Sequence, residues 1–268
     1  MNEKTGPGYA LITGASSGIG AAIAREYASR GKSLVLTARR AERLQALADE
    51  LGGKVRCEVL CADLAEHAAP EALFAATSAL GLHVDTLVNN AGYGVPGRFL
   101  SQDWKTHGDF LQVMIGAVGH LTHLYLPAME AAGFGRILNV ASLAGLVPAS
   151  AGHTLYGASK AWLIRFSESL ALEMASRGIN VTALCPGFTY TEFHDVNGMR
   201  ERVAKLPGAL WLTSEAVARI GVDAVEAGQM RVVTGSANKL VSMVSKYAPD
   251  ALARALVASK SKDFRDAD

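Results

Sequence analysis

The sequence predicts an α/β protein with a Rossmann-like, doubly wound parallel sheet of about seven strands and helices on both faces. Three observations carry this prediction. Apolar runs of strand length alternate with amphipathic stretches of helix length along most of the chain. The strand-like runs are continuously hydrophobic, as strands buried on both faces are. The chain has 268 residues, 50% of them hydrophobic, which is enough for a sizeable core.

The first strand and helix set the pattern for the rest. YALIT (9–13) has the composition of a buried strand. In the next stretch Ile19, Ile23 and Tyr27 recur on one helical face, and Gly31 can end the helix. The further expected strands are residues 33–39, 54–63, 85–92, 136–142, 180–187 and 230–235. The further expected helices are residues 41–51, 70–80, 103–132, 154–176 and 214–228.

Composition narrows the class of protein. No linker, repeat or low-complexity segment divides the chain, so residues 1–268 are expected to form one domain. The formal charge is +1, so no overall field attracts nucleic acid or an anionic membrane, and partners must be sought at local sites. No segment has the roughly 18 uncharged apolar residues of a membrane span, and the N-terminus lacks an apolar signal region. We therefore expect a soluble, cytoplasmic protein.

The three cysteines are sparse and odd in number. Cys57 and Cys61 are spaced to lie on one face of an expected strand rather than in a CxxC loop. Together with Cys185 they are interpreted as buried thiols in a reducing compartment.

The glycine-rich stretch TGASSGIG (13–20) lies between the first strand and the first helix. In a doubly wound sheet this is where a dinucleotide pyrophosphate binds the N–H groups at the helix start. Gly14 permits the tight turn, Gly18 lets the backbone approach the phosphates, and Gly20 lets the helix pack against the strand. The hydroxyls of two serines in the stretch can add hydrogen-bond donors. The context favours a phosphate cradle over a plain turn.

A proton donor for carbonyl reduction is also present in the sequence. Hydride transfer to a carbonyl leaves an alkoxide, which must gain a proton from an acid of suitable pKa. Tyr156 and Lys160 are four residues apart on an expected helix, so the ammonium group can lower the pKa of the phenol. Ser142 ends a strand and can donate a hydrogen bond to the carbonyl oxygen. These three residues are the predicted catalytic set.

With TGASSGIG, NNAG (89–92), Ser142, YGASK (156–160) and PGFTYT (186–191) in this order, the chain resembles the short-chain dehydrogenase/reductase family. The motifs span about residues 9–235 and follow the expected strands and helices. Five motifs in order are a specific signature. The resemblance implies an enzyme that moves a hydride between a nicotinamide cofactor and a carbonyl or alcohol.

The resemblance also implies cofactor contacts at the strand ends. Asp63 meets the adenine ring, and residues 90–92 line the adenine side, while Asn89 ties neighbouring strands together. Pro186 begins the floor beneath the nicotinamide. With the arginines discussed next, the full expected set is Gly14, Ser16, Ser17, Gly18, Ile19, Gly20, Arg39, Arg40, Asp63, Asn90, Ala91, Gly92, Tyr156, Lys160, Pro186, Gly187 and Thr191.

The end of the second strand predicts the cofactor. Enzymes that prefer NAD usually carry an acidic residue there to bind the ribose hydroxyl. Here the segment is Thr37, Ala38, Arg39, Arg40, with no carboxylate to repel a 2′-phosphate. Two guanidinium groups can bind that phosphate, Arg39 more directly than Arg40. The sequence therefore predicts NADP(H).

Two functions from different classes follow. The first is an NADP(H)-dependent oxidoreductase that interconverts a carbonyl (ketone or aldehyde) and an alcohol. The second is a catalytically weak dinucleotide-binding regulatory or scaffold protein of the same fold. A zinc site is not expected, because His120 and His123 have no third ligand at a recognisable spacing.

Substrate and assembly are expected to depend on the last third of the chain. The segment 188–212 is rich in apolar side chains and is interpreted either as helix packing or as a lid over an apolar substrate. The amphipathic C-terminal extension, at about 236–268, can cover the pocket, join a subunit interface or touch a membrane surface. The family resemblance favours a homodimer or homotetramer.

One residue departs from the family pattern. The family has an asparagine in the middle of the helix after the fourth strand, whose backbone carbonyl holds a water that links the catalytic lysine to solvent. Alignment places Met114 there, and no asparagine occurs between Arg98 and Leu138. Either the backbone carbonyl suffices, or the relay is interrupted and the proton reaches Tyr156 by another route such as His153.

Overall fold

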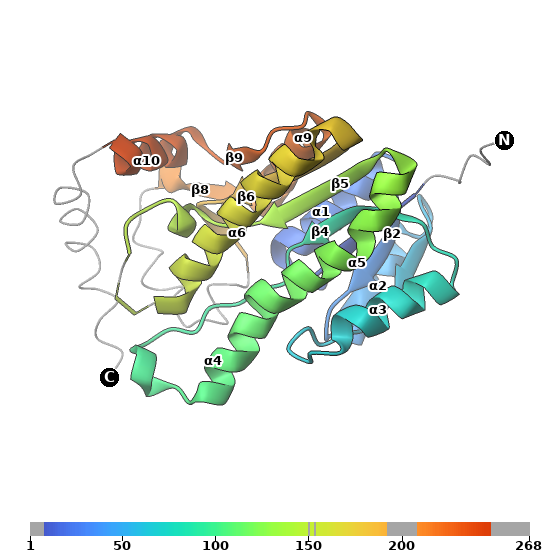
Figure 1. Cartoon of the computed structure of the whole chain (residues 1–268), viewed down its shortest axis with the longest axis horizontal. Helices are drawn as coiled ribbons and strands as arrows, with labels where there is room; N and C mark the ends of the chain where they lie inside the picture. Colours follow the sequence, from blue (N-terminus) through green and yellow to red (C-terminus); the bar gives the residue numbers. More distant parts are fainter. Residues whose placement is uncertain (1–7, 150, 153, 192–207, 248–268) are drawn as a thin grey trace.

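The computed structural model describes residues 8–149, 151–152, 154–191 and 208–247. At its centre lies a seven-stranded sheet in which every pairing is parallel (Figure 1). The predicted parallel sheet is confirmed. In spatial order the strands are β3 (Cys57–Val59), β2 (Ser33–Thr37), β1 (Tyr9–Thr13), β4 (Val84–Asn89), β5 (Gly135–Val140), β6 (Ile179–Cys185) and β9 (Arg231–Val233).

Helices cover both faces of the sheet (Figure 1). Each central strand sends alternate side chains into two separate cores, so that Ile12 enters one and Leu11 the other. On the first face lie α1 (Gly18–Ser29), α2 (Ala41–Leu51) and α9 (Ser214–Glu226); on the second lie α3 (Ala69–Ala79), α5 (Ala117–Ala132) and α6 (Thr154–Met174).

The helix expected at 103–132 is built in three parts. α4 (Trp104–Leu111) passes into a π-helical segment, η2 (Gln112–Gly116), and then into α5. The amide of Ala117 donates to the carbonyl of Gln112, five residues earlier. Such π-helical segments are common at functional sites. The short 3-10 helices are η1 (Phe99–Ser101), η3 (Leu143–Gly145), η4 (Ala175–Arg177) and η5 (Gly208–Leu210).

A second, two-stranded parallel sheet was not expected from the sequence. β7 (Phe188–Tyr190) pairs with β8 (Trp211–Thr213), and the rings of Tyr190 and Trp211 stack with centroids 4.7 Å apart. The two strands hold together the ends of the predicted lid. Residues 192–207 of that lid lie outside the described residues, as do His153 and the end of the C-terminal extension. The described part of the extension is α10 (Ser236–Tyr247).

The prediction for the cysteines is wrong in part. β3 ends at Val59, and Cys61 lies beyond it with an exposed side chain. Cys57 is half-buried and only Cys185 is buried, and all three thiols are free. β3 is an edge strand with one neighbour, so it is short and partly open to solvent.

A buried polar chain crosses the centre of the sheet. Asn89 donates from Nδ2 to Oδ1 of Asn139 at 2.8 Å, and Asn139 donates to Oγ of Ser167 at 2.9 Å. The predicted role of Asn89 in tying strands together is confirmed. None of the helices in the described ranges has the length and apolar composition of a membrane span.

Candidate active site

The strand order creates a crevice at the carboxyl edge of the sheet. β1 and β4 are neighbours, but β2 and β3 extend to one side of them and β5, β6 and β9 to the other. The connections that leave β1 and β4 therefore run to opposite faces, and a ligand can bind between them. Gly14, Asn90, Ser142 and Pro186 all follow strand ends at this edge.

The hydroxyl of Thr13 links the ends of β1 and β4 at this edge by hydrogen bonds. It donates to the carbonyl of Val88 at 3.1 Å and accepts from the amides of Asn90 and Ala91 at 2.9 and 3.0 Å. The side-chain amide of Asn90 donates to the carbonyls of Thr13 and Gly14 at 2.9 and 3.2 Å. The side chain of Asn90 thus holds the start of the glycine loop by two hydrogen bonds.

The glycine loop has no space for side chains at its tight points. Gly14 and Gly18 have φ values of +67° and +56°, which favour glycine. A Cβ atom on Gly20 would lie 2.4 Å from the carbonyl oxygen of Gly14. Ser17 caps α1 without a side-chain hydrogen bond, so the first-turn N–H groups retain their capacity for an anion. These residues fit a pyrophosphate.

The two predicted phosphate-binding arginines occupy different positions. Arg40 donates from Nη2 to Oγ of Ser17 at 2.7 Å and of Ser16 at 3.1 Å. The side chain of Arg39 is exposed, and its Nη1 lies 3.9 Å from Oδ2 of Asp63. Arg40 is therefore held over the glycine loop, while Arg39 lies at its rim beside the predicted adenine-contacting carboxylate.

The three predicted catalytic residues meet at the end of β5. The Ser142 hydroxyl is hydrogen-bonded to the Tyr156 phenol and accepts from the amide of Ala144 at 3.1 Å. Lys160 is 6% exposed and donates from Nζ to the carbonyl of Val140 at 2.7 Å. Its Nζ lies 5.8 Å from the centre of the Tyr156 ring. The helix α6 thus carries tyrosine and lysine to the strand that carries serine.

Burial dominates the acid–base properties of this set. Desolvation raises the pKa of Tyr156, and the hydrogen bond from Ser142 opposes that rise. Desolvation lowers the pKa of Lys160 to about 8, and the nearby Cys185 opposes that fall. The expected lowering of the phenol pKa by the ammonium group is not seen here, because the lysine amine is held by a backbone carbonyl and desolvation of the phenol is the larger effect.

The predicted nicotinamide floor is supported by a residue that the sequence did not reveal. A Cβ atom on Gly187 would lie 2.3 Å from Nδ2 of Asn238, which is fully buried on α10. Thr191 lies opposite the glycine loop, since a Cβ atom on Gly18 would be 3.3 Å from its methyl group. Pro186 and Gly187 are therefore clamped between η3, whose Leu143 amide donates to Pro186, and α10.

Met114 lies in the π-helical segment and touches the predicted adenine-side residues. Its side chain is 2% exposed, and a Cβ atom on Gly92 would lie 2.9 Å from its Sδ. The helix is thus irregular at the position where the family has its kink, although the residue is methionine. The irregularity comes from the backbone and not from an asparagine side chain.

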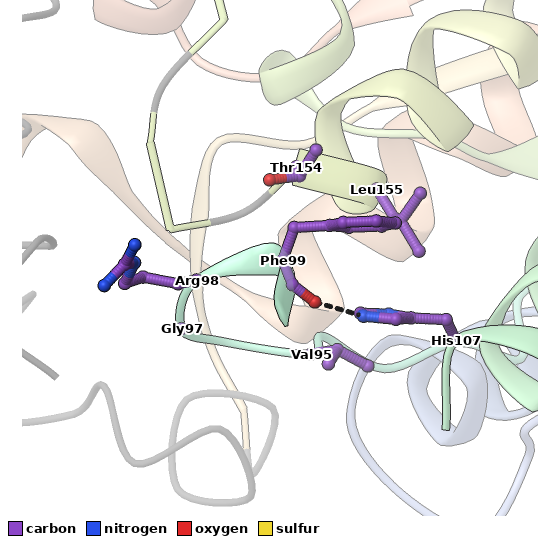
Figure 2. Close-up of a pocket in the computed structure, with 7 residues that line it drawn as sticks. All are labelled: Val95, Gly97, Arg98, Phe99, His107, Thr154 and Leu155. Carbon is purple, nitrogen blue, oxygen red and sulfur yellow. Dashed lines mark hydrogen bonds between the residues drawn. The ribbon is translucent and has the colours of Figure 1, made fainter. Parts of the chain in front are cut away.

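A small pocket with room for about one water molecule opens beside the start of α6, directly before Tyr156 (Figure 2). His107 is 5% exposed, donates from Nε2 to the carbonyl of Phe99 at 2.7 Å, and stacks on the Phe99 ring. His107 was not predicted to be a site residue, because no motif includes it. The pocket is lined by Val95, Gly97, Arg98, Phe99, His107, Thr154 and Leu155.

The remaining histidines form no metal site among the described residues, where no group of three His, Cys, Asp or Glu side chains converges. His120 lies instead 3.7 Å from Glu71 on α3.

The burial of Lys160 leads to a prediction about stability. Lys160→Met should raise the free energy of unfolding at pH 7 by about 1–3 kcal/mol, because it removes a desolvated amine that has no carboxylate partner among the residues that the structure describes. The pKa of Lys160 in the folded protein, about 8, lies below its usual 10.5, so protonation favours the unfolded chain. The penalty is complete below about pH 8 and fades towards about pH 10.5.

Urea titrations of both proteins across that pH range measure the difference. The advantage of the variant should shrink as the pH rises. Lys105→Met, which changes a lysine with 80% side-chain exposure, is the control and should show no such trend. A variant less stable than wild type at pH 7 would contradict the prediction.

Comparisons with known proteins agree with this geometry. A family model for short chain dehydrogenases matches residues 8–201. Oxidoreductase UcpA of Salmonella typhimurium is 39% identical over 192 residues, which cover 71% of this chain and 72% of that protein. Sulfoacetaldehyde reductase of Chromohalobacter salexigens is 37% identical over 216 residues, which cover 78% and 84%.

Solved structures give the same result. A short-chain dehydrogenase from Sphingobium yanoikuyae in complex with NADPH has a TM-score of 0.79 at 30% identity, over 97% of both chains. A 7β-hydroxysteroid dehydrogenase has a TM-score of 0.81 at 26% identity, over 96% of this chain and 95% of that one. The fold, the crevice and these likenesses lead to one conclusion: the chain belongs to the short-chain dehydrogenase family.

Proposed function

We propose that this protein is an NADP(H)-dependent oxidoreductase that interconverts a ketone or aldehyde and an alcohol, with Tyr156 as the acid and base. The observation that carries the proposal is the meeting of Ser142, Tyr156 and Lys160 at the crevice beside the glycine loop. Two similar solved structures support the choice of cofactor: the short-chain dehydrogenase from Sphingobium yanoikuyae contains NADPH, and a serine dehydrogenase contains NADP+.

The residues that would hold NADP(H) fit its chemical parts. The N–H groups at the start of α1 suit the pyrophosphate, and Arg39 and Arg40 suit the 2′-phosphate. Pro186 and Gly187 suit one face of the nicotinamide. When bound, the cofactor supplies or accepts the hydride.

The chain's own residues handle the proton. Ser142 donates a hydrogen bond to the substrate oxygen and orients the phenol of Tyr156 towards it. Because burial raises the pKa of Tyr156, the phenol keeps its proton at neutral pH and can give it to an alkoxide. Lys160, with a pKa of about 8, is largely cationic at pH 7 and supplies a positive charge 5.8 Å from the centre of the Tyr156 ring. This protonation state favours reduction as the working direction.

The proposal extends to the substrate, the location and the assembly of the protein. The aromatic rings of Phe188, Tyr190 and Trp211 at the lid base favour an apolar substrate and a lid at about 188–212. We place the protein in the cytoplasm as one domain that assembles into a homodimer or homotetramer.

The second candidate function, a weak dinucleotide-binding regulatory protein, is kept because Met114 stands where the family has an asparagine. Absorbance assays with NADPH and a panel of ketones separate the two.

Tyr156→Phe should abolish turnover, by about a thousandfold or more, while cofactor affinity stays nearly unchanged. The ring keeps its shape and only the transferable proton is lost. Tyr125→Phe removes another phenol that is buried, on α5, and serves as the control. Steady-state rates and fluorescence titration with NADPH measure both quantities. Turnover near the wild-type rate in Tyr156→Phe would rule out this mechanism.

Arg39→Ala and Arg40→Ala should each weaken NADPH binding by roughly tenfold while leaving NADH binding within about twofold, because each removes a partner of the 2′-phosphate. Arg25→Ala removes an exposed arginine paired with Glu50 and is the matched control. Dissociation constants for both cofactors provide the test. An unchanged ratio in both variants would refute the assignment to NADP(H).

Met114→Asn tests the proton relay implied by the family resemblance. Because the helix is already irregular at this point without an asparagine, we expect no gain in turnover and no change in the solvent isotope effect. A buried amide without partners should cost about 1–3 kcal/mol of stability. Met114→Leu is the control for packing. A faster variant with a smaller isotope effect would show instead that the methionine interrupts the relay.

A further inference from the structure

The helix α10 turns its apolar side chains to solvent. Leu240, Met243, Val244 and Tyr247 are 59%, 56%, 45% and 73% exposed. Their spacing of three, one and three residues places them on one face, here named the apolar face of α10. A surface helix normally directs such a face to the core, so this orientation is inverted.

The inward side of α10 is polar and firmly attached. Asn238 is fully buried and donates from Nδ2 to the carbonyls of Thr234 and Leu210 at 3.0 and 3.3 Å. Ser242 and Ser245 follow on the same side and are half-buried. Figure 1 places α10 at the edge of the molecule, next to β8 and β9. Because the hydrogen bond from Asn238 to Leu210 joins the inward side of α10 to η5, the apolar face of α10 is directed away from the protein.

The charges of α10 identify its partner. The helix contains Lys239 and Lys246 and no acidic residue. Both lysines lie on the same flank of the apolar face, because seven residues make nearly two full turns. Nζ of Lys246 also lies 5.2 Å from the centre of the Tyr247 ring. Apolar side chains bordered by lysine and an interfacial tyrosine suit the boundary between lipid headgroups and acyl chains.

A second copy of the chain suits this face less well. Two such helices packed antiparallel about a twofold axis would bring the lysine flanks together, so that Lys239 would face Lys246 of the partner subunit. The helix is also short, about 18 Å long, and offers little of the roughly 800 Å² that each partner buries in a stable interface. Like charges and small area both disfavour pairing of two α10 helices.

We propose that α10 docks the protein onto an anionic phospholipid surface, with its apolar face in the headgroup–acyl boundary and Lys239 and Lys246 at the phosphates. The attraction is local, since the net charge of the whole chain is only +1. Asn238 of the docked helix lies directly behind Gly187. Resting on the proposed function, this places the site close to the membrane, where an apolar carbonyl substrate is concentrated.

Co-sedimentation with vesicles tests the proposal. Wild-type protein should bind vesicles made of equal parts of phosphatidylcholine and phosphatidylglycerol, and salt should release it. It should bind vesicles of phosphatidylcholine alone only weakly. Leu240→Glu with Met243→Glu should lower binding by more than about tenfold, and Lys246→Gln by about fivefold. Leu80→Glu is the matched control, since Leu80 is 55% exposed at the end of α3, and should bind as wild type does.

Light scattering and NADPH binding on the same variants complete the test. Both should stay unchanged in the Leu240→Glu, Met243→Glu protein, which shows that it is folded. Tyr156→Phe should lose turnover but keep vesicle binding, so failure of the proposed function and failure of membrane docking are distinguishable. No binding of wild type to anionic vesicles, equal binding to both vesicle types, or a changed oligomeric state in the double variant would each overturn the proposal.

Discussion

The structure depends on one hydroxyl group at the point where the strand order reverses. Thr13 joins the ends of β1 and β4 through bonds to Val88, Asn90 and Ala91. The Asn90 amide then returns to the glycine loop. Because these bonds are largely shielded from water, they fix the loop without any side-chain cap on α1. The hydrogen bonds of the Thr13 hydroxyl therefore determine the direction of α1 and the position of the proposed phosphate site.

The burial of the predicted catalytic residues is unfavourable for stability. The buried amine of Lys160 donates a hydrogen bond to the carbonyl of Val140, and desolvation lowers its pKa. The same burial raises the pKa of Tyr156. Burial of these two ionisable groups does not stabilise the folded protein. The proposed reaction, however, needs a neutral phenol close to a cation, and burial of these two side chains provides that arrangement. Such a loss of stability in favour of activity is common at active sites.

Much of the fold could be predicted from hydrophobic patterns, and α2 begins and ends where its pattern does. The differences lie where distant parts of the chain decide the outcome. β3 is shorter than expected because it is an edge strand, and β7 and β8 are three-residue strands that form only by pairing with each other. Motif order predicted the contact between Ser142 and Tyr156. It could not predict Asn238 behind Gly187, or pKa values that depend on the depth of burial.

The pairing of β7 with β8 also affects how the family can diversify. The chain leaves the sheet region after Tyr190 and returns at Trp211, and Ser214 binds back to the carbonyl of Tyr190 at 3.0 Å. When both ends of a loop are fixed side by side, doubling its length adds only about 0.6 kcal/mol of closure entropy. Insertions, deletions and new side chains between them therefore scarcely disturb the core. If this segment is the proposed lid, its sequence can change, and with it the molecules accepted, while the residues proposed for the proton chemistry stay in place.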